Sequence, residues 1–198
     1  MNDKWIGLLL GAAIGYFACY SIAHASEHMR FEPCGGARDY HECAVITISG
    51  QIFPADLAEF IARIKDIRHA RVDLAGPGGA LRPAINIGEH IHARHWDTAV
   101  LPDSQCLSAC AYIWLAGSAR TMGPKSVLMW HSAFLGEDDQ HADGNGNALI
   151  GMYLAHMGLG YDAVDWMVGN DPNDEKAAFM DANGVPTEKQ FRFIRGTQ

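Results

Sequence analysis

A serine flanked by two cysteines opens a small-residue, apolar segment, "CLSACAYIWLAG" (residues 106–117). Ser108 could cap a helix, which is the commoner role of a serine at a helix start. It could instead be a nucleophile, because the first backbone N–H groups of a helix and its dipole can hold an oxyanion. The other residues able to do chemistry bear on this choice.

A serine nucleophile needs a base within hydrogen-bond reach, and His131 is the candidate. The segment "LMWHS" (128–132) places His131 at the end of an expected strand, beyond the helix that Ser108 begins. A second group, "GPGG" (76–79), also follows an expected strand. Because Gly78 and Gly79 have no side chain, their backbone can approach a substrate closely. An N–H there could form half of an oxyanion hole, and a plain tight turn is the alternative.

The elements that must position these residues alternate between strand and helix. Strands are expected over 44–50, 70–75, 97–101, 119–122 and 126–132. Helices are expected from Pro54 to 67, over 81–95, from Ser108 onward and over most of 148–185, with an exposed loop at 136–147. This alternation predicts an α/β layer fold with parallel strands and right-handed crossovers. In such folds ligands bind at the carboxyl ends of the strands, where "GPGG" and Ser108 both fall.

Composition fits one globular domain. The chain has 198 residues, of which 48% are hydrophobic and 19% charged, and it shows no internal repeat or linker. The formal net charge is -8 and there is no run of Lys and Arg. Since phosphate binding needs a basic face, a nucleic-acid partner is not expected.

The first 25 residues are typical of a signal peptide. Lys4 precedes an apolar stretch, and Ala23 and Ala25 form the small-x-small pattern of a signal-peptidase site. We therefore expect residues 1–25 to be removed and residues 26–198 to form a periplasmic or secreted domain. The alternative is a retained membrane anchor, because the apolar run approaches spanning length.

Four cysteines in the expected mature domain agree with export, because an oxidising compartment permits disulfides. Cys34 and Cys43 flank a short loop and are predicted to pair. Cys106 and Cys110 can pair only if Cys106 lies before the helix, because two helical cysteines one turn apart have poor geometry for a bridge. Otherwise both are small buried hydrophobic residues.

A metal site is not expected. His90, His92 and His95 are close in sequence, and His92 and His95 are one helical turn apart. However, His90 and His92 point to different faces of a helix, and no Glu-x-x-His pattern is present. A solvated helix face is the favoured interpretation.

Two stretches, "VDLAGPGGAL…INIGEHI" and "CLSACAYIWLAGSARTMGPKSVLMWHS", resemble the Clp-type serine peptidase family in their order and spacing. The similarity covers roughly residues 46–185 and is greatest to an exported bacterial branch with a Cys-x-Ser-Ala-Cys motif. It implies the ClpP/crotonase-like layered fold and possible homo-oligomers. It implies no cofactor.

The resemblance also implies roles for individual residues. Ser108 would be the nucleophile and His131 the general base, with oxyanion donors at the backbone N–H groups of Gly79 and Ala109. The acid would lie in the helical tail, and the candidates in order of match are Asp174, Asp171 and Asp165. Its role would be to orient the histidine tautomer. Lys125 raises a Ser/Lys alternative, as in signal-peptide peptidases of this fold, but an exposed turn is expected there.

The function expected is an exported serine peptidase that forms an acyl-enzyme on a peptide or protein substrate. Two alternatives remain open. One is a catalytically silent binding or assembly module with the same fold, and the other is a crotonase-type acyl-CoA enzyme. The second is disfavoured because an exported protein meets little acyl-CoA and because that chemistry has no use for a Ser/His pair.

Overall fold

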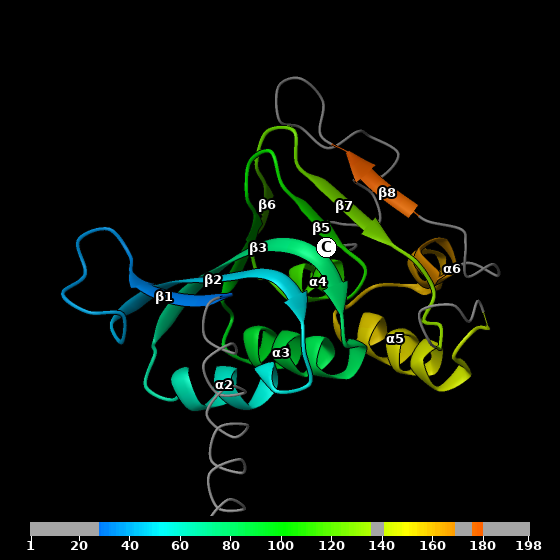
Figure 1. The fold of residues 1–198 in the computed structure, drawn as a ribbon, viewed down its shortest axis with the longest axis horizontal. Helices are drawn as coiled ribbons and strands as arrows, with labels where there is room; N and C mark the ends of the chain where they lie inside the picture. Colours follow the sequence, from blue (N-terminus) through cyan, green and yellow to red (C-terminus); the bar gives the residue numbers. More distant parts are fainter. Residues whose placement is uncertain (1–27, 136–140, 169–175, 180–198) are drawn as a thin grey trace, which may run out of the picture.

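The computed structural model describes residues 28–135, 141–168 and 176–179. The strands are β1 (Met29–Pro33), β2 (Cys43–Ile52), β3 (His69–Gly79), β4 (Asp97–Val100), β5 (Gln105–Leu107), β6 (Arg120–Met122), β7 (Val127–Trp130) and β8 (Lys176–Phe179). The helices are α2 (Asp56–Arg63), α3 (Leu81–Ala93), α4 (Ala109–Leu115), α5 (Gly144–His156) and α6 (Tyr161–Val168). Figure 1 shows α2 and α3 along one face of the sheet, with α5 and α6 beside the end of β7.

The strands form a mostly parallel sheet that divides at β3. Its main order is β1-β2-β3-β5-β7-β8, with β4 and then β6 branching from β3. The antiparallel pairs are β1 with β2 and β7 with β8. The first half of β3 pairs with β4 at Arg71–Leu74, whereas Gly76 pairs with Cys106 of β5. This division frees the carboxyl ends of β3, β5 and β7 to meet at one edge.

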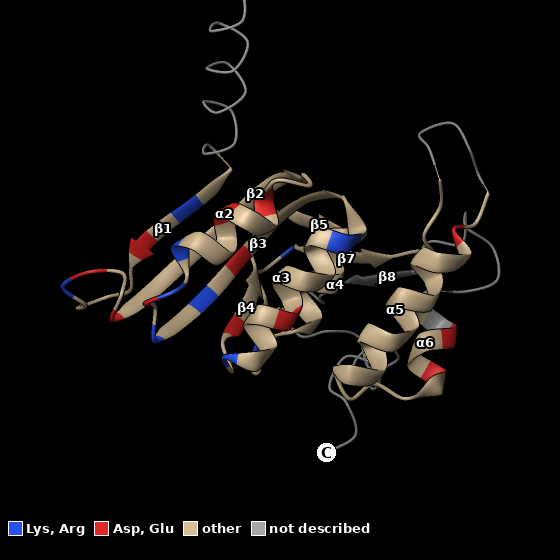
Figure 2. Ribbon diagram, turned by 90° about the horizontal axis from the view of Figure 1, so that it is seen from below, with Lys and Arg blue, Asp and Glu red and all other residues tan. Residues whose placement is uncertain are grey.

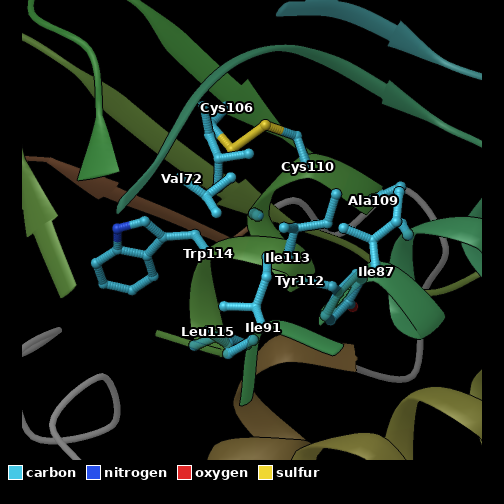
Figure 3. Close-up of a cluster of buried hydrophobic side chains, with 14 of the residues drawn as sticks. Val72, Ile87, Ile91, Cys106, Ala109, Cys110, Tyr112, Ile113, Trp114 and Leu115 are labelled. Carbon is cyan, nitrogen blue, oxygen red and sulfur yellow. A yellow bond between two sulfur atoms is a disulfide. The ribbon is translucent and has the colours of Figure 1, made fainter. Parts of the chain in front are cut away.

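The core lies between the sheet and the helices, with α4 at its centre. Every residue of α4 is buried, which is typical of a helix that is apolar on all sides. Figure 3 shows residues of this helix, Tyr112 and Ile113 among them, packed with Ile87 and Ile91 of α3 and with Val72 of β3. A helix held on all sides in this way is a rigid support for the residues at its start.

The expected α/β class is therefore confirmed, and so are most of the expected elements. Four differences stand out. β3 continues through "GPGG" to Gly79, because its glycines pair with Gln51 and Ile52 of β2. α5 begins at Gly144, inside the segment expected to be a loop, because Asp143 caps it by accepting a hydrogen bond from the Asn145 N–H.

The third difference is in the tail, where the sequence suggested helix over most of 148–185. β8 occupies residues 176–179 there and pairs antiparallel with β7. The strand β1 was also not expected. Its five residues pair in register with Ala44–Ile48 of β2.

Charged residues in Figure 2 are spread among the described elements, with Lys and Arg interspersed among Asp and Glu. None of the helices in the described ranges is long and apolar enough to cross a membrane. The expected signal peptide, residues 1–25, lies outside the described residues.

Candidate active site

Ser108 occupies a sharp turn between β5 and α4. Its backbone has φ 55° and ψ -124°, a conformation that costs a residue other than glycine roughly 1–3 kcal/mol. Its side chain makes no capping hydrogen bond to α4. Ser108 therefore occupies the N-cap position of α4 without a side-chain cap. A strained strand-to-helix turn at a serine resembles the nucleophile elbow of hydrolases.

Backbone contacts hold the turn in place. The Ser108 N–H donates to the Met129 carbonyl of β7 at 2.8 Å, and the Ser108 carbonyl accepts from the N–H groups of Ala111 and Tyr112 at 2.9 and 3.3 Å. Ala109 is the first residue of α4, where an N–H has no partner within the helix. That N–H directly follows Ser108 in the chain, and Ala109 itself is buried.

The glycine end of β3 lies directly against this turn. Gly78 has φ 97°, and a Cβ added to it would lie 2.6 Å from the Leu107 carbonyl oxygen and 2.7 Å from the Ser108 Cβ. Gly79, with φ 136°, is the last residue of β3 and lies opposite Ile52 of β2. Glycine is required at both positions by the positive φ and by the close approach of other backbone atoms, since a Cβ added to Gly79 would lie 2.3 Å from the Ile52 carbonyl oxygen.

His131 directly follows β7. This strand lies next to β5, the strand that leads into Ser108. Leu107 pairs with Met129 in this ladder, so the two strands end side by side. The His131 Nδ1 lies 2.7 Å from the Ser132 carbonyl oxygen. A proton on Nδ1 makes this a hydrogen bond and leaves Nε2 with a free lone pair, as a general base requires.

Two buried tyrosines fix the backbone at His131. The Tyr112 hydroxyl donates to the His131 carbonyl at 3.0 Å, and the Tyr153 hydroxyl of α5 donates to the Tyr112 carbonyl at 2.8 Å. Burial raises the pKa of both phenols well above the usual value, with nearby Glu89 adding to the effect on Tyr153. Both hydroxyls therefore remain protonated and act as donors at neutral pH.

The loop that follows His131 is held from α5. The Asn147 side chain accepts from the Ala133 N–H at 2.7 Å and donates to the Ala133 carbonyl at 3.2 Å. Asp143 donates its backbone N–H to the same carbonyl at 2.8 Å. Sequence periodicity gave no sign of Asn147, Tyr112 or Tyr153 as supporting residues, because their partners are distant in the chain.

A cleft of about 630 Å³ brings the candidate residues together. Ser108, His131 and Gly79 all line it. Its apolar lining consists of Pro54, Ala80, Leu81, Pro83, Tyr112, Ala133, Phe134 and Ile150, and its charged lining of Arg82 and Asp143. The Ser132 Oγ, also in this wall, is buried without a hydrogen-bond partner in the described part of the chain. The cleft is suited to a mainly apolar substrate with a polar backbone.

The acid predicted for the triad is not located. Asp174 and Asp171 lie outside the described residues, whereas Asp165 is an exposed residue of α6 and does not line the cleft. Lys125 is in an exposed turn before β7, 3.7 Å from Asp103, with 83% of its side chain exposed. It also does not line the cleft, so a Ser/Lys pair with Ser108 has no support here.

The histidines of α3 make other contacts. His92 packs against His156 of α5, with ring centroids 5.4 Å apart, and His156 pairs with Glu89 at 2.8 Å. Burial and the nearby Arg94 lower the pKa of His90. Over residues 28–135, 141–168 and 176–179, no group of three or more His, Cys, Asp or Glu side chains could hold a metal ion.

The predicted pair, Cys34 and Cys43, is a disulfide, and so are Cys106 and Cys110, whose pairing the sequence left open. Cys34 and Cys43 close the loop between β1 and β2, with Cα atoms 5.4 Å apart. Cys106 and Cys110 have Cα atoms 5.2 Å apart. Cys106 lies in β5, before the helix, which is the condition under which the sequence allowed this pair. The second disulfide spans Ser108.

A scan of the sequence against protein-family models and a search of curated proteins each found no match. Among solved structures, the chain is similar to a serine-to-alanine variant of the 1510-N membrane-bound stomatin-specific protease. The TM-score is 0.51 and the identity 18%, over 66% of this chain and 70% of that chain. A lysine-to-alanine variant of the same protease, in complex with a substrate peptide, has the same TM-score and identity over 66% of each chain. At this identity the similarity shows the fold, and the expected ClpP/crotonase-like layered fold is confirmed.

Proposed function

We propose that the protein is a serine peptidase that hydrolyses peptide bonds through an acyl-enzyme on Ser108. The observation that carries the proposal is the strained backbone of Ser108, a residue without a side-chain capping bond that lines the same cleft as His131. Strained backbone of this kind clusters at active sites. The similarity in fold to a protease adds support.

The proposed reaction is an acyl transfer. The Ser108 Oγ attacks the carbonyl carbon of the substrate while Nε2 of His131 takes the hydroxyl proton. Backbone N–H groups at Ala109 and Gly79 hold the oxyanion that forms. His131 then gives its proton to the leaving amine, and water, activated by the same base, releases the acyl group from the serine.

The third member of the proposed triad is Asp174, with Asp171 as the alternative. The Ser132 carbonyl, 2.7 Å from Nδ1, already supports the required tautomer in the described residues. An aspartate would add stabilisation of the imidazolium, which a neutral carbonyl supplies less well. Loss of a triad aspartate costs on the order of 10⁴ in turnover, so Asp174→Asn tests this part of the proposal directly.

We further propose export to the periplasm or beyond the cell, by way of residues 1–25. The two disulfides support it, since such bonds persist in oxidising compartments. Substrates would then be peptides or proteins met outside the cytosol, and assembly into homo-oligomers is proposed by similarity alone. The silent binding module and the acyl-CoA enzyme remain alternatives, and neither accounts for the strained serine.

The test is labelling of the purified protein by a fluorophosphonate probe, which reacts with activated serines. We expect the wild type to be labelled on Ser108 and the Ser108→Ala and His131→Ala variants to lose nearly all labelling. Hydrolysis of casein-derived peptides should be lost in parallel, and the double variant should lose little more, because the two groups act as a unit.

Two outcomes would contradict parts of this proposal. An unlabelled wild type that is correctly folded, as judged by circular dichroism, would favour the silent module. If Asp174→Asn keeps full activity and Asp171→Asn abolishes it, the acid is Asp171 and the acyl-enzyme mechanism stands.

A further inference from the structure

We propose that the Cys106–Cys110 disulfide is a positioning device for the nucleophile. It holds Ser108 and the Ala109 N–H in their reactive arrangement, so that the protein reacts at its full rate only with this bond formed. The inference rests on the proposed role of Ser108 and adds a requirement for oxidation at that same site. Neither cysteine takes part in the chemistry.

The two sulfur atoms tie together the elements on either side of the turn. Cys106 is fixed in the sheet, because it pairs with Gly76 of β3 and with Leu128 of β7. Cys110 is in the first turn of α4, a helix buried along its whole length. Both cysteines are themselves buried, with 0% and 3% of their surface exposed. The covalent bridge therefore joins two rigid anchors across a turn of three residues, 107–109.

Without the bridge, the strained backbone of this turn is expected to relax. Ser108 is at φ 55°, a conformation that side chains other than glycine disfavour. No side-chain capping bond from Ser108 compensates. Rotation of Ser108 toward the ordinary β region would turn the peptide that links it to Ala109. That motion would move the proposed oxyanion donor and the hydroxyl together, which is how a small displacement causes a large loss of rate.

A contribution to global stability explains this disulfide less well than the positioning role does. In the chain-entropy model, a bridge stabilises a protein less as the loop that it closes shortens. Cys106 and Cys110 are four residues apart, whereas Cys34 and Cys43 are nine apart. The longer bridge lies between β1 and β2, and neither of its cysteines lines the cleft. It is therefore a matched control with a larger expected effect on stability and none on reactivity.

The first experiment compares C106A/C110A and C106S/C110S with C34A/C43A and the wild type. The measured quantities are the rate constant kinact and the half-saturating concentration KI for the fluorophosphonate, together with the thermal midpoint. For the two variants that lack the Cys106–Cys110 bridge we expect kinact to fall at least tenfold and KI to change less than twofold. The C34A/C43A variant should lose thermal stability and keep the wild-type kinact. Wild-type kinact in either bridge-free variant would overturn the proposal.

A second measurement, on the wild type, tests the proposal even if the cysteine variants do not fold. Dithiothreitol reduces each disulfide to two thiols and is itself oxidised to its cyclic disulfide, so the electrons balance. Partial reduction of the folded wild type, mapped by alkylation, should lower kinact in proportion to the reduced Cys106–Cys110 pair. Reoxidation with oxidised glutathione should restore it. A kinact independent of that fraction would overturn the proposal.

Hydrogen exchange separates this inference from the proposed function. Peptides covering 105–115 should exchange faster once the bridge is absent, while peptides covering β2 remain protected. If the wild type does not react with the probe but exchange rises in this way, the proposed function fails, and the bridge holds the Ser108 turn in place without a role in reactivity. If the wild type reacts and neither kinact nor exchange changes without the bridge, the positioning role alone fails.

Discussion

Ser108 and Tyr112 are four residues apart, at the start and in the middle of the same short buried helix. The serine lines the cleft, while the tyrosine hydroxyl donates to the His131 carbonyl at 3.0 Å. One rigid helix thus sets the positions of both the proposed nucleophile and the backbone that carries the proposed base. Tyr112 is a positioning residue, because it contacts the base's main chain and not the reacting atoms.

Removal of the Tyr112 hydroxyl should therefore lower the rate of labelling by the probe by more than a loss of fold stability alone would explain. In Tyr112→Phe the His131 carbonyl loses its donor, at a cost of about 1–3 kcal/mol. If about 1.4 kcal/mol of that cost is added to the activation free energy because His131 is misplaced, kinact for the probe falls roughly tenfold. Rates measured over a pH series should fall at every pH, because the change is geometric.

Tyr161→Phe is the control, since Tyr161 is 81% exposed on α6 and does not line the cleft. It should keep both the rate and the thermal midpoint. An unchanged rate in Tyr112→Phe would mean that the His131 backbone is held without this bond.

At the scale of elements, the feature that shapes the site is the close approach of β3 to the β5–α4 turn. The would-be Cβ of Gly78 lies 2.9 Å from the Ala109 nitrogen, as well as near Leu107 and Ser108. A strand end that carried side chains could not reach this position. The glycines of "GPGG" thus let two backbones meet where an oxyanion would bind.

Gly78→Ala is expected to damage both stability and reactivity. The added methyl group conflicts with backbone atoms, and φ 97° disfavours alanine. We expect a loss of roughly 1–3 kcal/mol in the free energy of unfolding and a marked fall in the probe rate. Urea unfolding followed by circular dichroism measures the first, and the labelling assay measures the second.

Gly151→Ala is the matched substitution. Gly151 is inside α5, and nothing lies within 4 Å of its would-be Cβ. Alanine there should stabilise the protein by about 0.5–1 kcal/mol and leave labelling unchanged. If Gly78→Ala behaves as Gly151→Ala does, the packing of β3 against the serine turn is not needed for reactivity.

Local sequence patterns predicted well those helices and strands whose signal lies within one short stretch of the chain. The apolar spacing after Pro54 and the alternating β-branched run over 44–50 indicated α2 and β2. The strand β8 and the extension of β3 to Gly79 depend on partners far along the chain, and such pairings leave no periodic signal. Tyr112 was missed for a similar reason, because its bond to His131 depends on strand order.

At the scale of the whole molecule, strand order decides whether the serine and histidine meet. In the sequence, 22 residues separate Ser108 and His131, and alternation of strand and helix left their proximity undecided. The parallel pairing of β5 with β7 brings the ends of both strands to one edge. The identity of the pair came from residue types and from a family resemblance, whereas its placement came from the sheet.

The extent of the mature protein is a prediction at this same scale. The Ala23-x-Ala25 pattern predicts cleavage before Ser26 when the full chain is expressed with an export pathway. Intact-mass measurement of the periplasmic fraction should give the mass of residues 26–198 with two disulfides. A mass that retains residues 1–25, found in the membrane fraction, would establish the anchor instead.

Within the described part of the chain, three buried indole rings, those of Trp96, Trp114 and Trp130, give the core an intrinsic fluorescence signal. Trp114 and Trp130 lie 6.4 Å apart, and Trp130 directly precedes the histidine at the cleft. Shielded from water, these rings should emit at the blue end of the tryptophan range. A ligand that shifts the segment after β7 should then change the emission without any added dye, so occupancy of the cleft can be followed by fluorescence.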